Sequence, residues 1–565
     1  MQIRRAIIVF LLGLSQAVDL PANIPDAVGR RGMVVSANLM ASRLGLNILR
    51  RGGNAIDAAV ATGFGLAVTE PRAGNIGGGG FMVIRLADGT TTTIDFREKA
   101  PAAAHGDMYL DENGQVIANL STEGILAAGV PGTVAGYGLA LRKYGKMSWG
   151  TVVTLAADLA ESGYAVSYQL NRDLVAHEQF LTRFESTRQI FYPREQPLRL
   201  NALFKQPDLA ATLRRIATQG AEEFYTGRTA QLIAAHMERT GGLITLADLA
   251  DYRAIERPPI EFDYRDVHII SMGPPSSGGI LLAEILNQME LVNFSEVKFH
   301  SAEHIHTFVE ASRRAYADRA HFLGDPDFVD IPVEGLISDA YAARRWQDFS
   351  PRWATGSDET AHGAIIFALE SEETTHFSVV DRWGNAVAVT TTINGLYGCG
   401  EVVQGAGFLL NNEMDDFALK PGHPNMFGLT GSRANAIEPG KRMLSSMTPT
   451  IVTRDGSLLL IAGSPGGSKI ITTVAQVISN VVDFDLPIKN AVEAPRFHHQ
   501  WLPDVIISEP QGISAETRQR LNRMGHRVDY LDGYIGSAHC IMVDPVTGWN
   551  FGAADSRRES GAAGY

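Results

Sequence analysis

A threonine at the head of a strand-like run is the residue best placed to do chemistry in this chain. Residues 374–394 read TTHFSVVDRWGNAVAVTTTIN, and acidic residues come directly before Thr374. A threonine that becomes a new N-terminus can act as a nucleophile, because its own α-amine then serves as the base for its hydroxyl. The pattern therefore suggests an N-terminal-nucleophile hydrolase, although most threonine-rich runs are ordinary strands.

The residues around Thr374 have the pattern of a β-hairpin. Residues 376–380 alternate in the manner of a strand, a turn is centred on Trp383, and residues 386–393 are β-branched enough to return as a second strand. With the turn at this position, Thr392 lies opposite Thr374. The sequence predicts two neighbouring hydroxyls at one end of the hairpin, one of which can orient the other.

Charged residues elsewhere could bind a substrate. Arg97, in DFREKAP, stands at the exit of a predicted strand, where its planar guanidinium can hold a carboxylate through two parallel hydrogen bonds. The NNEMDDF segment concentrates Glu413, Asp415 and Asp416, which can receive an ammonium group. Each feature alone also fits an ordinary solvated surface.

Two further segments supply neutral donors. LSSMTPT offers the hydroxyls of Ser445 and Ser446, and GSPGGS follows an apolar strand with Gly466 and Gly467. Successive glycines let backbone N–H groups approach a reacting carbonyl, as an oxyanion hole requires, although the same glycines also suit a plain tight turn. One cation, acidic acceptors and small donors together match a zwitterionic α-amino acid head group.

A competing pattern is H-x-x-E-H at residues 300–304, the inverted zinc-protease motif. It would use His300 and His304 as metal ligands and Glu303 as a base. Against it, Ser301 is a good helix N-cap, which would leave His300 outside the helix that carries His304. A zinc protease therefore stays as an alternative hypothesis.

The elements that position these residues indicate a layered α/β protein. Apolar residues at helical spacing end at Gly52-Gly53, and Asn54 can cap a second, almost wholly apolar helix that runs through Val68. A glycine-rich loop, a strand, a turn at residues 88–89 and a returning strand then deliver Arg97. Residues 140–350 are mostly amphipathic helices, and strand patterns return at 374–394, 458–467, 505–508 and 538–544. Strands from both ends of the chain would share one core.

Composition excludes several classes of protein. The 565 residues are 45% hydrophobic with 57 glycines, as in a well-packed globular protein, and the net charge of -13 argues against a nucleic-acid partner. Two arginines at positions 4 and 5, an apolar run over 6–14 and the small-residue site at 15–17 predict a signal peptide cleaved before Val18. Such a protein would be exported, and no later segment is apolar enough to anchor it in a membrane. Cys399 and Cys540 have no metal-binding spacing, and export would permit a disulfide between them.

An ordered series of motifs spans nearly the whole mature chain, namely GGNAIDAAVATGFG, IDFREKAP, AAGVPGTVAGY, GPPSSGG, TTHFSVVD, LLNNEMDDF, LSSMTPT and GSPGGS. Together they resemble the γ-glutamyltransferases, also called γ-glutamyltranspeptidases or glutathione hydrolases, of the bacterial periplasmic type. The resemblance implies a four-layer αββα N-terminal-nucleophile hydrolase. It also implies a precursor that cuts itself between Glu373 and Thr374 into paired subunits, a large one of residues 18–373 and a small one of residues 374–565.

The resemblance also assigns roles to residues. Thr374 would be the nucleophile, Thr392 would support its hydroxyl, and the backbone of Gly466 and Gly467 would stabilise the oxyanion. The glutamyl α-carboxylate would be bound by Arg97, Ser445 and Ser446, and the α-ammonium by Asn394, Glu413 and Asp416. Glutathione or another γ-glutamyl compound would be the donor, and water, an amino acid or a peptide the acceptor, with no metal or cofactor required.

Two positions depart from the family pattern. Residues 421–436 resemble the loop that covers the glutamyl pocket, but Phe427 stands where several bacterial relatives carry tyrosine, so a lid hydrogen bond would be missing. Cys399 occupies a place where a small residue or threonine is expected. Related acylases that remove glutaryl groups from cephalosporins share the scaffold and are an alternative, as is a non-catalytic binding protein that kept it. Arg97 and Asp416 favour an intact amino acid head group.

Overall fold

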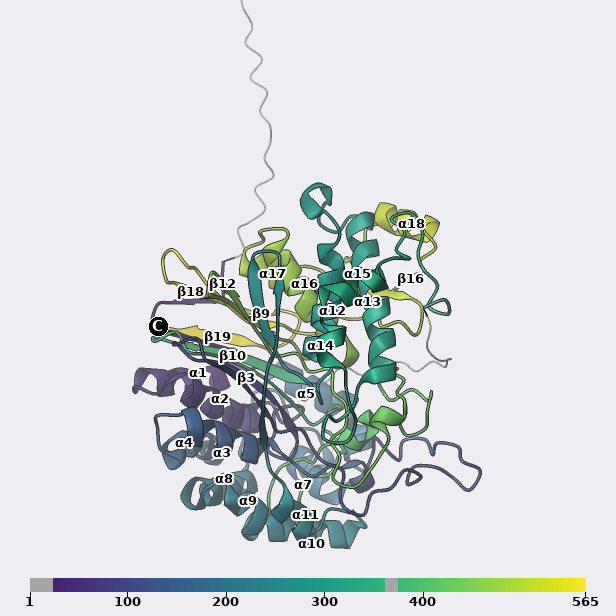
Figure 1. Ribbon diagram of the computed structural model, residues 1–565. Helices are drawn as coiled ribbons and strands as arrows, with labels where there is room; N and C mark the ends of the chain where they lie inside the picture. Colours follow the sequence, from purple (N-terminus) through teal and green to yellow (C-terminus); the bar gives the residue numbers. More distant parts are fainter. Residues whose placement is uncertain (1–23, 361–373) are drawn as a thin grey trace, which may run out of the picture.

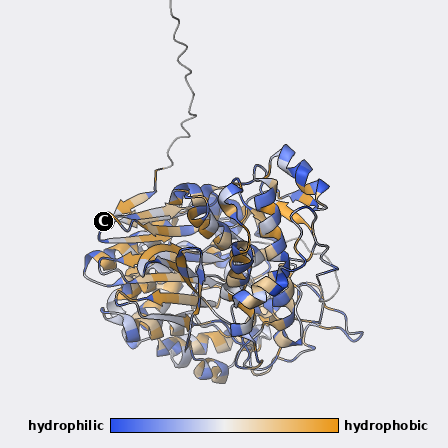
Figure 2. Cartoon of the chain, turned by 45° about the horizontal axis from the view of Figure 1, so that its top comes forward, coloured by the Kyte–Doolittle hydropathy of each residue, from blue (hydrophilic) through white to orange (hydrophobic). Residues whose placement is uncertain are grey.

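Two stacked β-sheets form the centre of the protein, and helices cover both outer faces (Figure 1). The structure is a computed structural model that describes residues 24–360 and 374–565. Hydrophobic residues concentrate in the central strands and on the inward sides of the helices (Figure 2). This arrangement confirms the expected four-layer αββα fold.

The first sheet carries the predicted hairpin at its centre. All of its neighbouring strands are antiparallel. Its order is β19 (Gly561–Gly564), β2 (Gly32–Ser36), β10 (Thr375–Asp381), β11 (Ala386–Thr392), β3 (Gly79–Arg85), β4 (Thr91–Asp95) and β7 (Ile255–Arg257). Every residue of β10 and β11 is buried, because the sheet is covered on both faces. Arg97 follows the end of β4, as the sequence predicts.

The second sheet packs against the inner face of the first. Its order is β1 (Ala27–Gly29), β18 (Asn550–Ala554), β17 (His539–Val543), β13 (Ser457–Ala462), β12 (Thr450–Arg454), β9 (Val267–Ser271) and β8 (Ile260–Tyr264). The sequence pattern missed β7, β8 and β9 within a region expected to be mostly helical. These strands have only three to five residues each, although β8 alternates buried and exposed side chains as an edge strand does.

Helices from the first half of the chain cover the first sheet. The helix α2 lies directly on the sheet and is buried throughout its length, which explains its apolar sequence. Asn54 forms the predicted cap, because its side-chain oxygen accepts from the N–H groups of Ile56 and Asp57 while Asp57 accepts from the Asn54 N–H. The helices on this side are α1 (Leu39–Arg50), α2 (Ala55–Thr69), α3 (Thr133–Tyr144), α4 (Trp149–Ser162), α5 (Tyr168–Ala176), α6 (Glu178–Leu181), α7 (Glu185–Phe191), α8 (Pro207–Gln219), α9 (Glu222–Thr226), α10 (Arg228–Thr240) and α11 (Leu246–Asp251).

Helices from the middle and the end of the chain cover the second sheet. They are α12 (Gly278–Glu290), α13 (Ala302–Phe322), α14 (Val333–Leu336), α15 (Asp339–Arg345), α16 (Ile470–Val482), α17 (Ile488–Glu493) and α18 (Ala515–Arg523). Two small sheets lie outside the layers, one of β5 (Tyr164–Ala165) and β6 (Leu203–Phe204), the other of β14 (Phe497–His498), β15 (Ile506–Ser508) and β16 (Val528–Tyr530). Within the described ranges, no helix combines the length and the apolar character that a membrane span requires.

Segments on either side of residue 374 build the same layers. In the first sheet, β10 pairs with β2 on one side and β11 pairs with β3 on the other. The hydrophobic core beneath this sheet likewise joins Val34 and Ile56 with Phe377 and Val389. The two parts of the chain therefore share one folding unit, as the strand patterns at both ends of the sequence predict.

Candidate active site

The two predicted hydroxyls meet at the end of the central hairpin. Thr375 pairs with Thr391 across the hairpin, and this register brings Thr374 opposite Thr392. The Thr374 hydroxyl donates to the Thr392 Oγ1 over 3.5 Å, and both side chains are buried. Thr392 Oγ1 also accepts from the backbone N–H of Asn394, at 2.8 Å. The predicted juxtaposition is confirmed.

A narrow pocket opens beside these hydroxyls, with a free volume of about 20 Å³, room for little more than one water molecule. Eight of the ten residues singled out in the sequence line it, namely Arg97, Thr374, Thr392, Asn394, Asp416, Ser445, Ser446 and Gly467. The remaining two lie directly behind these, since Glu413 is ion-paired to Arg97 and Gly466 precedes Gly467. Segments that are hundreds of residues apart in sequence therefore converge on one site.

Arg97 is held by the acidic residues that the sequence analysis assigned to ammonium binding. Its Nη1 lies 2.5 Å from Glu413 Oε2, and its Nη2 donates to Asp416. Its Nε donates to the carbonyl of Met443 at 3.2 Å. Burial alone would lower the pKa of this guanidinium, but the carboxylates of Glu413 and Asp416 raise it overall. Arg97 therefore stays charged, with its charge balanced by acids.

Burial raises the pKa values of the acids around Arg97. The pKa of Glu413 lies well above its ordinary value, and that of Asp416 is also raised, in both cases because burial outweighs the attraction of Arg97. Glu98 lies 3.5 Å from Arg97 Nη1, and burial raises its pKa to about 8. Glu98 was not expected at the site. Its position directly after Arg97 is the one signal in the sequence that could have indicated it.

The serine pair is fixed by the GPPSSGG motif, which the sequence analysis left without a role. The N–H and the hydroxyl of Ser277 both donate to the carbonyl of Ser445, at 2.8 and 2.7 Å. Ser276 Oγ donates to the carbonyl of Met447 at 2.6 Å. The two serines that precede α12 therefore hold residues 445–447 by the carbonyls of Ser445 and Met447 and leave the hydroxyls of Ser445 and Ser446 at the pocket.

The glycine loop lies opposite the serines and is covered by Phe427. Gly466 and Gly467 both have positive φ, +137° and +53°, which other residues adopt with strain. The ring of Phe427 sits against Gly467, where any side chain on this glycine would collide with it. The Phe427 carbonyl accepts from Gln500 Nε2 at 3.1 Å, and its side chain is buried. Phe427 closes the pocket by packing, in place of the hydroxyl that tyrosine would bring.

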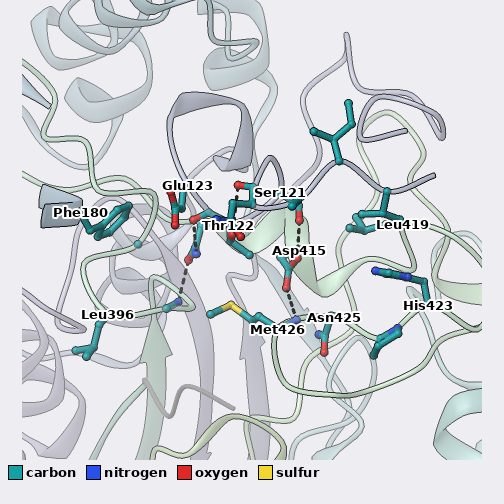
Figure 3. A pocket seen from close by; sticks show the side chains of 18 of the residues that line it. Ser121, Thr122, Glu123, Phe180, Leu396, Asp415, Leu419, His423, Asn425 and Met426 are labelled. Atoms are coloured by element: carbon teal, nitrogen blue, oxygen red, sulfur yellow. Dashed lines mark hydrogen bonds between the residues drawn. The ribbon is translucent and has the colours of Figure 1, made fainter. Parts of the chain in front are cut away.

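A second, larger pocket is lined in part by Asn425 and Met426, which directly precede Phe427 in the same loop (Figure 3). It has a volume of about 460 Å³. Asp415 anchors the loop from this side, because its carboxylate accepts from Ser121 Oγ at 2.6 Å and from the Met426 N–H at 2.8 Å. Asp416 holds the same loop from the narrow pocket through Asn425, at 3.2 Å. Neighbouring acids thus fix both sides of residues 421–436.

The H-x-x-E-H pattern does not assemble into a metal site. Ser301 caps α13 as expected, and His300 lies outside the helix with a φ of +55°. The Nδ1 of His304 accepts from the N–H of His300, while Glu303 points to the surface and pairs with Arg520. The described residues offer one potential cluster of metal ligands elsewhere, formed by His306, Glu310 and His526.

The cluster of His306, Glu310 and His526 is poorly suited to a cation. Glu310 is buried and already paired with Arg314, at 2.8 Å, and lies 3.5 Å from Arg313. The two guanidinium groups lower the pKa of this carboxyl although burial alone would raise it.

Cys399 and Cys540 are both buried with free thiols, so the disulfide that export would permit is not formed.

Some sequence predictions fall outside the described residues. The predicted signal peptide lies within residues 1–23, and Glu373, on the far side of the predicted cleavage bond, lies within 361–373. Thr374 itself is described. The structure therefore fixes the position of the candidate nucleophile at the end of β10.

Comparisons with known proteins identify the family of this chain. A family model described as gamma-glutamyltranspeptidase matches residues 41–565. The glutathione hydrolase proenzyme of Escherichia coli (strain K12) is 48% identical over 538 residues, which cover 95% of this chain and 92% of that protein. The crystal structure of γ-glutamyltranspeptidase from Helicobacter pylori is 46% identical and covers 57% of this chain and 92% of that one, with a TM-score of 0.56. The structure of cephalosporin acylase from Bacillus halodurans is 26% identical, covers 97% of this chain and 98% of that one, and has a TM-score of 0.83. The chain belongs to the γ-glutamyltranspeptidase family.

Proposed function

We propose that Thr374 is the nucleophile with which this enzyme cuts its own precursor and then transfers γ-glutamyl groups. As a member of its family, the chain is a γ-glutamyl-cleaving enzyme made as a self-processing precursor. The observation that carries the assignment of Thr374 is its hydroxyl, which donates to Thr392 Oγ1 at the mouth of a pocket lined by Arg97 and Asp416.

Maturation would begin when the Thr374 Oγ attacks the carbonyl carbon of Glu373. The peptide bond to the Thr374 nitrogen breaks as the ester to its oxygen forms, and water then hydrolyses that ester. The products are a large subunit of residues 18–373, which ends in a carboxylate, and a small subunit of residues 374–565, which begins with a free amine. The two remain together as a heterodimer, because each sheet combines strands from both subunits.

In turnover, the freed α-amine of Thr374 takes the proton of its hydroxyl as that oxygen attacks the γ-carbonyl of the donor. Such amines titrate near pH 7.7–8.0 in model compounds, so the base is increasingly available as the pH rises through this range. Backbone N–H groups of Gly466 and Gly467 stabilise the tetrahedral oxyanion. The amine part of the donor leaves, which is cysteinylglycine for glutathione, and water, an amino acid or a peptide then removes the glutamyl group from Thr374.

The charges that line the narrow pocket are complementary to those of the donor head group. Its α-carboxylate would be bound by Arg97 and by the hydroxyls of Ser445 and Ser446. Its α-ammonium would be bound by Asn394, Glu413 and Asp416. The Arg97 guanidinium is already paired with two of these acids, so a bound zwitterion completes an alternating arrangement of charges.

Glutaryl compounds, the substrates of the related acylases, lack this ammonium. A glutaryl group would leave Glu413 and Asp416 without a cationic ligand, so we expect γ-glutamyl-p-nitroanilide to be cleaved far faster than glutaryl-p-nitroanilide. The rates of p-nitroaniline release from the two compounds show whether the enzyme prefers γ-glutamyl or glutaryl donors. The same assay with and without glycylglycine measures how the glutamyl group divides between water and a peptide acceptor. Equal rates on both anilides would contradict the ammonium assignment.

The self-cleavage is tested on purified protein by gel electrophoresis and N-terminal sequencing. The wild type is expected to give two fragments, one of which begins TTHFSVV. Thr374→Ala should give a single uncut chain without activity, whereas Thr375→Ala, at the next position in β10, should still be cut. Normal cutting of the Thr374→Ala variant would refute the assignment.

Fractionation of cells expressing the full chain tests the proposed export to the periplasm, which rests on the signal pattern in residues 1–17.

A further inference from the structure

The narrow pocket contains a second buried guanidinium, which differs from Arg97 in its surroundings. Arg319 lies near the end of α13, is 5% exposed and lines the pocket together with Thr374 and Ser446. Arg97 has three carboxylates within ion-pair distance, but among the described residues no carboxylate oxygen lies that close to Arg319. Its hydrogen bonds go to serine hydroxyls instead.

These hydrogen bonds have a fixed direction. Arg319 Nε donates to Ser277 Oγ at 3.1 Å, and its Nη2 donates to Ser446 Oγ at 3.3 Å. A guanidinium has only donors, so both hydroxyl oxygens must act as acceptors and must direct their own protons elsewhere. The Ser277 proton goes to the carbonyl of Ser445.

The Ser446 proton has no such partner among the described residues, and the side chain lines the pocket. Ser445 is in a similar position, because its Oγ accepts from the Met447 N–H at 3.2 Å and its proton is left for the pocket. Two hydroxyls therefore present donors to the same small space, next to an arginine that forms no ion pair with the described residues. That combination is complementary to an anion with two oxygen atoms.

We propose that Arg319 is a positioning residue that makes the enzyme specific for donors with a free α-carboxylate. It fixes the Ser446 hydroxyl as a donor, and its charge adds to the attraction for the carboxylate. This inference rests on the proposed function, since it concerns the head group of the same donor.

The charge of Arg319 persists in the folded protein. Burial lowers the pKa of its guanidinium to about 10, which still leaves it protonated at neutral pH. Asp416 attracts this guanidinium only from beyond ion-pair distance. A buried charge without an ion-pair partner is unfavourable, and an anionic ligand offsets this penalty. A neutral group in place of the carboxylate gains nothing from Arg319, and its amide N–H groups would oppose the donors of Ser445 and Ser446.

The test compares two donors that differ at one group, γ-glutamyl-p-nitroanilide and the same anilide with its α-carboxylate converted to a carboxamide. The quantity measured is the ratio of kcat/KM for the carboxylate compound to kcat/KM for the carboxamide. Arg319→Gln should lower this ratio by about 10- to 100-fold, mainly through KM of the carboxylate compound, with self-cleavage retained. Arg319→Lys keeps the charge, but one amine cannot bridge Ser277 and Ser446, so we expect a smaller fall of about 3- to 10-fold.

A double-mutant cycle with Ser446→Ala shows whether Arg319 changes the ratio by way of the Ser446 hydroxyl or independently of it. The combined loss of Arg319→Gln and Ser446→Ala should be smaller than the product of the single losses. Arg314→Gln is the matched control, because Arg314 is a buried arginine of the same helix that contacts Glu310 and Asp348 instead of the pocket. It should lower the melting temperature and leave the ratio unchanged.

The outcomes distinguish the two proposals. A wild type that cleaves both compounds equally well would overturn the proposed carboxylate site itself. A wild type that prefers the carboxylate, combined with an unchanged ratio in Arg319→Gln, would overturn the role of Arg319 alone. Should Arg319→Gln fail to mature, the same ratio and the same cycle are measured on Arg319→Lys, where an unchanged ratio likewise contradicts the proposal.

Discussion

Thr374 with Thr392 and His300 with His304 are both short sequence patterns that suggest catalysis, and the fold treats them in opposite ways. The two threonine hydroxyls meet and open onto a pocket that further polar side chains reach. The two histidines also lie close together, but aromatic rings surround His304, and its Nδ1 is occupied by the N–H of His300. Proximity therefore does not separate a chemical site from a structural one.

The difference lies in what surrounds each pair. Thr374 is placed by strand register, and the same sheet directs Arg97 to its side. His304 lies among the rings of Phe294, Phe299, Phe484 and Phe497, with centroids 4.8 to 6.1 Å away. A reactive group needs several polar neighbours from other elements at a pocket. The threonine pair has them, whereas the histidine pair, within the described residues, has one hydrogen bond to another segment, from His300 Nδ1 to the Gly512 carbonyl.

Apart from the nucleophile itself, the largest effect on catalysis is expected from removal of the Thr392 hydroxyl. Thr392→Val keeps the shape of the side chain but removes the acceptor for both Thr374 and the Asn394 N–H. Loss of such a buried acceptor should lower kcat/KM by about 10- to 100-fold and slow self-cleavage, whereas Thr392→Ser should retain most of both. Steady-state rates and a time course of cleavage on gels provide the measurement.

Thr391→Val is the matched control for this change. The Thr391 hydroxyl donates to the Gly79 carbonyl at 2.7 Å, so its loss disturbs the same strand without touching the pocket. Comparable catalytic losses in Thr391→Val and Thr392→Val would mean that Thr392 acts only by holding the sheet together.

A pH-dependent effect on stability, with no effect on catalysis, is expected from His304. Burial lowers the pKa of His304 to about 3, below the value of about 6.5 in an unfolded chain. Between these values the unfolded chain binds a proton that the folded protein excludes, so the contribution of His304 to stability is full above pH 6.5 and falls as the pH is lowered. This one group can account for at most about 5 kcal/mol.

His304→Asn removes the titration but keeps an acceptor at the position of Nδ1 for the His300 N–H. We expect a lower melting temperature at pH 7, because ring packing is lost, and a shallower decrease from pH 6.5 to pH 4 than in the wild type. His105→Asn, at an exposed position, is the control. An unchanged slope for His304→Asn would show that this histidine does not limit acid stability.

The smallest effect is expected at Glu303, the base of the rival zinc hypothesis. Its exposed side chain pairs with Arg520 at the surface, and such pairs contribute about 0–1 kcal/mol. Glu303→Gln and prolonged treatment with a chelator should both leave γ-glutamyl cleavage unchanged. Loss of activity in the chelator that zinc restores would revive the metal hypothesis.

The sequence predicted those features that depend on neighbouring residues. The turn at Trp383 sets the hairpin register, and the strand before Arg97 sets its exit, so local patterns sufficed for both. Arg319 was missed because an arginine in a 21-residue helix reads as a solvated charge. Only the packing of α13 beside the start of α12 brings it to Ser277 and Ser446. The short strands β7 to β9 were missed because they form only when the sheets provide partners.

The interleaved strand order has a consequence for the life of the enzyme. Strand β10 begins beside the proposed cleavage point and pairs with β2 from the N-terminal part of the chain. The last strand, β19, pairs with the opposite edge of β2. Neither fragment can leave without dismantling both sheets. If two different precursors are produced in one cell, the large subunit of one should therefore never pair with the small subunit of the other. Each pair of subunits comes from a single polypeptide.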